Sequence, residues 1–284
     1  MTSIAAGMLR QKYQDDGFLV VEKVMPEPVI IRLRSELDRL CADALSLAPH
    51  LREQLTFERD LIAMQPGRSE LSSAAVGDAV YMIGDLAAFG GLFVGLINYA
   101  PVLDLVEALF GSSEFEFQFY QALIKQAHVG SRLSWHRDIG NPVIDCLTHE
   151  TIRVMLCLDD TTAANGATQV VRGSHRVGEE EARAQMRFRE PFWTDEDVIT
   201  LECPAGSAVV LSSRIIHGGG PNRSLIPRRN LISGWSGPAN HPVTTMRFTA
   251  QGLMPRSRDP YRQLQSQSVF ASHPDLSLQT VLAS

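Results

Sequence analysis

Apolar residues recur at helical spacing in the first part of the chain. One helix begins near Pro28, a residue suited to the first helical turn. Its predicted apolar face consists of Ile30, Leu33, Leu37, Leu40 and Ala44. A second helix over residues 102–109 is followed by Gly111, a natural stop. A short strand is expected before both helices, at residues 18–23.

The pattern changes after Gly111, where short strand-like runs separated by Gly, Pro, Asn and Asp turns dominate. These runs cover residues 115–124, 152–158, 168–171, 207–211 and 229–233. Several short strands without helices between them favour a sandwich or barrel over alternating β-α units. We therefore expect a mainly β protein of one domain over residues 1–284. Its N-terminal part, about 1–111, would be helical, its β core would span about 112–250, and the tail offers no motif.

Two segments of the N-terminal part have no clear period. Residues 48–80 are polar and predict loops and short helices near a site entrance, so part of the segment 48–100 is expected to form a lid. Residues 86–103 form the longest apolar stretch, which glycines, Asn98 and Pro101 interrupt. Its length is marginal for a membrane span, so a buried or lid-forming segment is the preferred interpretation.

Composition and charge narrow the class of protein. Apolar residues make up 44% of the chain and charged residues 20%, as in a soluble globular protein. The net charge is −6 with no clustered Lys or Arg, so neither nucleic acid nor an anionic membrane is an expected partner. No signal peptide is evident, and the four cysteines, Cys41, Cys146, Cys157 and Cys203, show no metal or redox spacing. Buried free thiols in the cytoplasm are expected.

The first candidate site is His136-Arg137-Asp138. In a strand, residues two apart point to the same face, so the imidazole and the carboxylate would reach one point in space. Alone this motif is weak, because such a triplet is also typical of a surface pair or a buried structural histidine.

The second is His217, which follows a strand-like run and precedes three glycines. The glycines would let the backbone turn sharply just after the imidazole. Two histidines and one carboxylate form the facial triad of non-haem iron(II), which leaves three coordination positions open. 2-Oxoglutarate takes two of them and dioxygen needs one.

The third is Arg228, with Arg229 beside it. A guanidinium group can hold the distal carboxylate of 2-oxoglutarate through two hydrogen bonds. If His217 ends one strand and Arg228 opens the next, the chain returns Arg228 to the same pocket, while Arg229 faces the other way. Taken alone, an ordinary surface arginine pair is the simpler interpretation.

Together these motifs resemble the phytanoyl-CoA dioxygenase family of iron(II)/2-oxoglutarate oxygenases. The resemblance covers about residues 10–236, in conserved order and rough spacing. It consists of DGFLVV at 16–21, LFG at 109–111, WHRD at 135–138, LDD at 158–160, NGA at 165–167, RGSHR at 172–176, HGGGPNRS at 217–224 and Arg228.

The resemblance implies a double-stranded β-helix, a cupin-like jelly roll with helices on one side. It implies that His136, Asp138 and His217 bind iron(II), and that Arg228 binds 2-oxoglutarate, with Arg229 the second choice. Gln121 and Lys125, four residues apart on one strand, would face the same pocket. A polar edge strand is nearly as good an interpretation of that pair.

The chain departs from the family pattern at two positions. The family often has Ser two residues after the distal histidine, where this chain has Gly219, so another donor must hold 2-oxoglutarate or the site is looser. Arg137 stands where Gln is common, and it would point outward or reach an acidic group. His175 is expected to fix a loop, and His128, His149 and His241 are treated as incidental.

The implied activity is oxidation of an unactivated C–H bond by iron(II), 2-oxoglutarate and dioxygen, most simply hydroxylation. Desaturation, cyclisation and endoperoxide formation remain open. A zinc hydrolase or isomerase on the same barrel and a non-catalytic metal-binding homologue are the alternatives, and Asp138 disfavours a halogenase. The substrate is expected to be a small molecule, by preference one of secondary metabolism, and its identity and the oligomeric state do not follow from the sequence.

Overall fold

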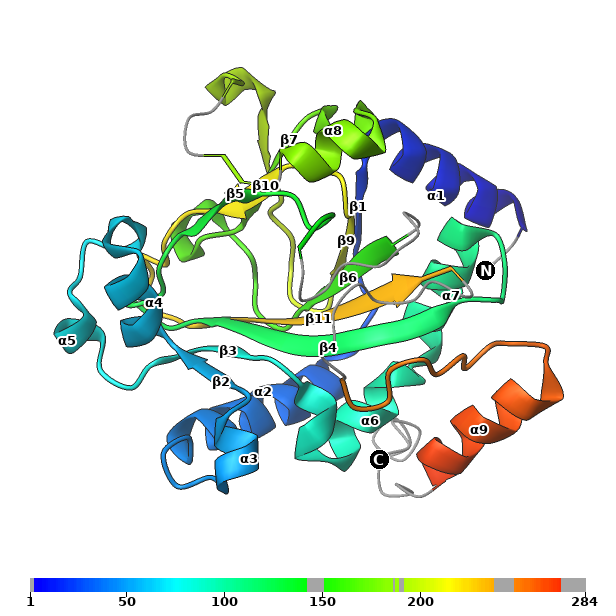
Figure 1. Ribbon diagram of the computed structural model, residues 1–284, viewed down its shortest axis with the longest axis horizontal. Coiled ribbons are helices and arrows are strands. Elements are labelled where there is room, and N and C mark those ends of the chain that lie inside the picture. Colours follow the sequence, from blue (N-terminus) through cyan, green and yellow to red (C-terminus); the bar gives the residue numbers. More distant parts are fainter. Residues whose placement is uncertain (1–2, 142–150, 186, 189–191, 238–247, 272–284) are drawn as a thin grey trace.

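Two antiparallel sheets form the centre of the molecule. The computed structural model describes residues 3–141, 151–185, 187–188, 192–237 and 248–271 (Figure 1). The larger sheet has seven strands in the order β1-β9-β6-β11-β4-β3-β2. These are β1 (Phe18–Val21), β9 (Ala208–Ser212), β6 (Thr151–Cys157), β11 (Arg228–Ser236), β4 (Glu116–Lys125), β3 (Val80–Ile83) and β2 (Leu55–Phe57).

The smaller sheet has four strands in the order β5-β10-β7-β8. These are β5 (Leu133–His136), β10 (His217–Gly219), β7 (Thr168–Val171) and β8 (Val198–Thr200). Figure 1 shows it lying across one face of the larger sheet. Strands adjacent in space but distant in sequence, such as β1 with β9, give the crossed connections of a jelly roll.

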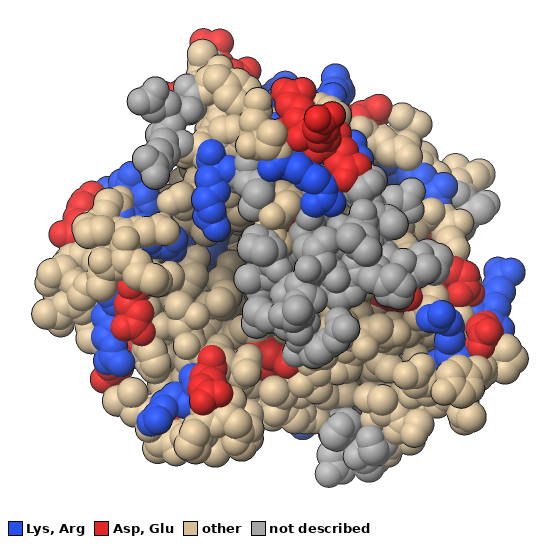
Figure 2. Space-filling view, viewed as in Figure 1, with Lys and Arg blue, Asp and Glu red and all other residues tan. Residues whose placement is uncertain are grey.

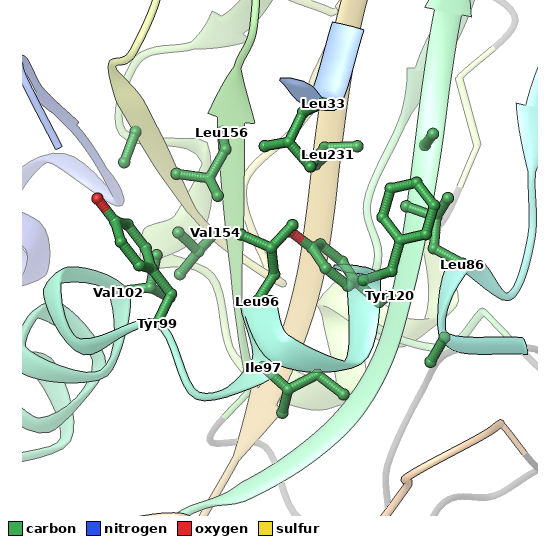
Figure 3. Close-up of a cluster of buried hydrophobic side chains, with 14 of the residues drawn as sticks. Leu33, Leu86, Leu96, Ile97, Tyr99, Val102, Tyr120, Val154, Leu156 and Leu231 are labelled. Carbon is green, nitrogen blue, oxygen red and sulfur yellow. The ribbon is translucent and has the colours of Figure 1, made fainter. Parts of the chain in front are cut away.

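Helices cover the opposite face of the larger sheet. Side chains of α2 (Glu27–Ala42), α6 (Gly91–Ile97) and α7 (Ala100–Phe110) share one buried cluster with the sheet. Figure 3 shows part of it: Leu33, Leu96, Ile97, Tyr99 and Val102 from the helical side lie near Tyr120, Val154, Leu156 and Leu231 of the sheet. This burial removes apolar surface from water and fixes the sheet in place.

The other helices lie at the edges. The α-helices are α1 (Ser3–Asp16), α3 (Pro49–Arg52), α4 (Glu58–Met64), α5 (Ser73–Val76), α8 (Glu179–Ala184) and α9 (Pro260–Ala271). The 3-10 helices are η1 (Pro66–Arg68), η2 (Leu86–Phe89), η3 (Ala163–Asn165), η4 (Ser174–Arg176) and η5 (Asp195–Asp197).

Strand alternation divides the larger sheet into an apolar face and a site face. On β4, Tyr120 and Ala122 point to the helices, whereas Gln121, Leu123 and Lys125 line a pocket between the sheets. The strands of the sheet that carry site residues therefore present polar groups on the face away from the helices.

The predicted jelly roll is confirmed, but helices cover more of the described chain than strands do, so the expected predominance of β structure was overstated. The strand expected at residues 18–23 is confirmed as β1, but the N-terminal part, otherwise expected to be helical, also contributes β2 and β3 to the larger sheet. The tail after residue 250 contains α9, which the sequence did not suggest. Gly111 ends α7 in a left-handed conformation with φ 68°, as predicted.

The apolar stretch at residues 86–103 forms η2, α6 and the start of α7. Among the described residues, one helical stretch, Gly91–Phe110, is long and apolar enough to cross a membrane by length and composition. However, 61% of its apolar 18-residue window is buried inside the structure, as expected of a core segment.

Candidate active site

The two histidines of the predicted triad are direct neighbours across the smaller sheet. His136 is the last residue of β5 and His217 the first of β10, and they are register partners. Their ring centroids are 4.2 Å apart. The prediction that His217 ends a strand is therefore wrong: it begins one, and the pairing with β5 brings the two imidazoles together.

Asp138 completes the group from a bend just after β5, not from within a strand as predicted. Its main-chain N–H donates to the Ser213 carbonyl at 3.1 Å, which positions the bend. Asp138 Oδ1 lies 3.6 Å from His136 Nε2 and 3.9 Å from His217 Nε2. One donor atom from each residue lies within 4.8 Å of the other two, a spacing that a single metal ion can bridge.

Hydrogen bonds orient both imidazoles for metal binding. His136 Nδ1 lies 2.8 Å from the Ser134 carbonyl, and His217 Nδ1 lies 3.2 Å from the Ile215 carbonyl. A carbonyl only accepts, so Nδ1 carries the proton in both rings and Nε2 keeps its lone pair for a metal.

The protonation states of His217 and Asp138 also favour metal binding. Burial, followed by the nearby His136, lowers the pKa of His217 to about 4, against the opposing effect of Asp138. Burial alone would raise the pKa of Asp138, but His217, His136 and Arg153 outweigh it and the pKa is lowered. At neutral pH the site therefore offers a neutral imidazole at His217 and an ionised carboxylate.

Arg153 of β6 contacts the second carboxylate oxygen. Its Nε lies 3.4 Å from Asp138 Oδ2, and its guanidinium lies 4.8 Å from the centre of the Phe119 ring. The carboxylate thus has one oxygen nearest the histidines and the other beside a buried cation. Arg153 was not singled out in the sequence because it stands among apolar neighbours in β6.

A sharp turn was predicted at the glycines after His217, but the chain does not turn there. Gly218 and Gly219 continue β10, and neither has a positive φ. A Cβ on Gly218 would lie 3.0 Å from the Leu133 carbonyl oxygen and 3.1 Å from the Trp135 ring. Glycine is needed here because β5 approaches closely.

The triad borders a pocket of about 340 Å³ between the two sheets. Figure 2 shows a hollow on this face with Lys and Arg side chains around it. The lining includes Leu61, Gln65, Arg68 and Tyr81 from the N-terminal segment, and Gln121, Leu123, Lys125, Arg153, Met155, Arg187, Leu211, Arg228, Asn230 and Ile232 from further along the chain. Part of residues 48–100 thus borders the site, as expected, although β2 and β3 of that segment extend the larger sheet.

Arg228 and Lys125 lie at one end of this pocket as register partners on β11 and β4. Arg228 Nη1 donates to the Gly166 carbonyl at 2.6 Å, and Lys125 Nζ donates to the Gly220 carbonyl. Arg228 Nε has no hydrogen-bond partner among the described residues. Burial and the neighbouring Arg228 lower the pKa of Lys125 well below its usual range, and Glu58 opposes this shift. Two buried cations side by side form a site for an anion.

Arg229 faces the other side of the sheet. Its guanidinium donates twice to Asp159, at 2.9 and 2.8 Å, and also to Asp38 of α2, at 2.8 and 2.7 Å. These carboxylates account for its charge, so Arg229 ties the sheet to the helices and does not reach the pocket.

Other residues singled out in the sequence lie away from the pocket. His175 Nε2 lies 3.0 Å from the Gln14 carbonyl, which fixes its loop against α1. His128 is exposed. Arg137 does not point outward: it is buried and donates to the Ser174 carbonyl at 2.6 Å and to the Arg214 carbonyl.

The cysteine prediction is confirmed in part. Cys157 and Cys203 are buried free thiols, whereas Cys41 is free but only partly buried. Cys146, His149 and His241 lie outside the described residues.

A jelly roll that brings two histidines and a carboxylate together at its pocket belongs to the class of non-haem metal enzymes. The model of the phytanoyl-CoA dioxygenase family matches residues 13–230, and the chain belongs to this family. The predicted family is confirmed.

Relatives of known function and a solved structure agree with this assignment. L-proline trans-4-hydroxylase of Streptomyces griseoviridis is 25% identical over 278 residues, covering 86% of this chain and 92% of that enzyme. An ectoine dioxygenase of Bordetella parapertussis is 23% identical over 271 residues, covering 87% and 79%. The epimerase SnoN in complex with Fe3+, alpha ketoglutarate and nogalamycin RO has the same fold, with a TM-score of 0.61 at 19% identity over 83% of this chain and 85% of SnoN.

Proposed function

We propose that His136, Asp138 and His217 bind the iron(II) of this 2-oxoglutarate-dependent dioxygenase, and that Arg228 with Lys125 binds the distal carboxylate of 2-oxoglutarate. The observation that carries the proposal is the convergence of His136 Nε2, His217 Nε2 and Asp138 Oδ1 within 4.8 Å, at a pocket that also contains Arg228. Two nitrogens and one oxygen suit iron(II) and leave open positions for an oxygenase.

When bound, the iron and its co-substrate supply the oxidation, in which dioxygen is consumed, 2-oxoglutarate becomes succinate and carbon dioxide, and a C–H bond of the substrate is oxidised. The chain's own residues hold the metal and 2-oxoglutarate, orient the substrate and shield the site from water. Leu123, Met155 and Ile232 give the pocket an apolar floor that limits water, while Gln121 adds a hydrogen-bonding group.

Many family members have a serine at the position of Gly219, and its hydroxyl helps to hold 2-oxoglutarate. In this chain, Lys125 provides the hydrogen-bond donor instead. A Cβ at Gly219 would lie 3.6 Å from Lys125 Nζ, so the ammonium group lies next to the position where the serine side chain would begin. Lys125 therefore takes over the role of that hydroxyl, and Arg228 supplies the planar donor pair.

The substrate is a small metabolite, and hydroxylation is the simplest outcome. The names of the two relatives above, a proline hydroxylase and an ectoine dioxygenase, indicate small-molecule substrates. A pocket of about 340 Å³ fits a compound of that size. A single domain, a cytoplasmic location and a role in secondary metabolism remain predictions.

The test is consumption of 2-oxoglutarate. Purified protein, tested with a panel of small metabolites as substrates, should release succinate when iron(II), 2-oxoglutarate and dioxygen are all present, and removal of any one, or addition of a chelator, should stop it. His217→Ala should abolish release, whereas His128→Ala, at an exposed histidine, should not. Undiminished release by metal-free protein would refute the proposal.

A further inference from the structure

We propose that the substrate carries a carboxylate and that Arg68 binds it. The inference rests on the proposed function, because it assigns one cation of the same pocket to the substrate and leaves the others to the co-substrate and the metal. It names the chemical class of the substrate: small organic acids, including amino acids.

Arg68 is a buried cation that forms no ion pair among the described residues. It ends η1, lines the pocket and is only 7% exposed. Its guanidinium lies 5.1 Å from the centre of the Tyr81 ring, and Nη2 donates to Ser131 Oγ at 3.5 Å, a long hydrogen bond. Arg68 Nε has no partner in the part of the chain that the structure describes. Burying a guanidinium is costly unless it is paired, so a bound anion is the expected partner.

The same chain shows what a structural buried arginine looks like. Arg229 is 8% exposed, nearly the same as Arg68, yet it donates to two carboxylates, Asp159 and Asp38. Arg68 is in the opposite situation. The nearby Glu58 accepts a hydrogen bond from the Ser131 main chain through Oε1, and its Oε2 has no hydrogen-bond partner among the described residues, yet no ion pair joins Glu58 to Arg68 there. A purely structural role leaves the orientation of Arg68 Nε unexplained.

The 2-oxoglutarate site is complete without Arg68. Lys125 and Arg228 are cross-strand partners on the larger sheet and provide two cations for one carboxylate. Arg68 comes from η1, outside the jelly-roll strands. Its charge contributes to lowering the pKa of Lys125, so Arg68 lies near the co-substrate cations, while the exposed Gln65 of the same segment also lines the pocket.

The charge of the whole pocket agrees with an acidic substrate. Among the described residues, its lining contains one carboxylate, Asp138, and several cations: Arg68, Lys125, Arg153, Arg187 and Arg228. In the proposed site, Asp138 binds the metal and contacts Arg153. Arg228 and Lys125 bind the distal carboxylate of 2-oxoglutarate. Arg68 and the exposed Arg187 are left facing the remaining space, which therefore favours an anion.

The experiment compares matched acids and amides as ligands. Protein loaded anaerobically with iron(II) and 2-oxoglutarate is titrated calorimetrically with L-proline and L-prolinamide, and with cyclohexanecarboxylate and cyclohexanecarboxamide. The wild type and Arg68→Gln are compared with Arg132→Gln, which removes an exposed neighbouring charge that does not line the main pocket. We expect at least one acid to bind roughly tenfold or more tightly than its amide, and Arg68→Gln alone to lose this preference.

Three results overturn the proposal: amides that bind as tightly as acids, a preference that survives in Arg68→Gln, or no binding of any acid by the wild type. The visible charge-transfer band of the iron(II)–2-oxoglutarate complex is recorded separately in each variant. It should be unchanged in Arg68→Gln, and loss of 2-oxoglutarate binding there would move Arg68 to the co-substrate site and refute its assignment. A missing band in the wild type would instead refute the proposed function, and acid binding is measured in either case.

Discussion

Arg153 Nε lies 3.4 Å from Asp138 Oδ2, while Asp138 Oδ1 lies nearest the two histidine Nε2 atoms. The two carboxylate oxygens are thus divided between a cation and the metal position. This division favours coordination through one oxygen, which preserves the open positions that an oxygenase needs.

Replacing Arg153 should weaken the metal site. Loss of a residue that orients a metal ligand typically lowers metal affinity about 10–100-fold. We expect Arg153→Met to raise the dissociation constant for iron(II) by that factor, measured anaerobically by competition with a chromogenic chelator. Arg68→Gln, which removes another pocket cation, is the control and should leave the constant unchanged. Equal affinity in wild type and Arg153→Met would show that Asp138 needs no such support.

Substitution of Arg228 should affect 2-oxoglutarate binding, whereas substitution of Arg229 should affect the stability of the fold. Losing a buried charge-assisted pair costs about 2–5 kcal/mol, so Arg228→Ala should raise the 2-oxoglutarate KM by roughly one to three orders of magnitude. Arg229→Ala should leave that KM nearly unchanged but lower the free energy of unfolding by about 3 kcal/mol, because the buried Asp159 loses its two hydrogen bonds from the Arg229 guanidinium and keeps its ion pair with Arg34. Urea unfolding and 2-oxoglutarate kinetics on both variants test this, and the reverse ranking in KM would pass the assignment to Arg229.

Lys125 should make 2-oxoglutarate binding depend on pH. Burial and Arg228 hold its pKa well below the usual range in the free protein, and an incoming carboxylate would raise it again. A group whose pKa rises on binding takes up protons, so affinity should be highest below the free-state pKa and fall as pH rises through it toward the bound-state pKa. Calorimetry in buffers of different ionisation enthalpy should show proton uptake that Lys125→Met abolishes. Proton release instead would contradict this electrostatic account.

Gly218 should be intolerant of a side chain. A Cβ there would meet the Leu133 carbonyl oxygen at 3.0 Å and the Trp135 ring at 3.1 Å, pushing apart the strands that align His136 with His217. Gly218→Ala should therefore lower the free energy of unfolding by about 1–3 kcal/mol and weaken iron binding. Gly220→Ala is the matched control, since a Cβ there has no neighbour within 4 Å. If both variants behave like the wild type in thermal unfolding and metal titration, the close approach of β5 is not a constraint.

The sequence predicted those parts of the site whose chemistry follows from a motif or from strand parity. His136, Asp138 and His217 were found by residue type and family spacing. Arg228 and Arg229 were assigned to opposite faces by period-two alternation, and the structure places them so.

What the sequence missed lacks such a signal. β5 and β10 are four and three residues long, too short for alternation to be seen, so the strand that His217 begins was taken for one it ends. Arg68 and Arg153 come from a short 3-10 helix and an apolar strand, and only the tertiary packing brings them to the pocket. Helix α9 has only a weak apolar face, which explains why it was not predicted.

The most direct test of the central claim is an anaerobic optical titration of iron(II) into protein saturated with 2-oxoglutarate. If His136, Asp138 and His217 hold the iron, the wild type should develop the visible charge-transfer band of a chelated 2-oxoglutarate with one iron per chain. Asp138→Ala and His217→Ala should show little or no band, and His128→Ala a full one. A full-strength band in both triad variants would contradict the account and place the iron elsewhere.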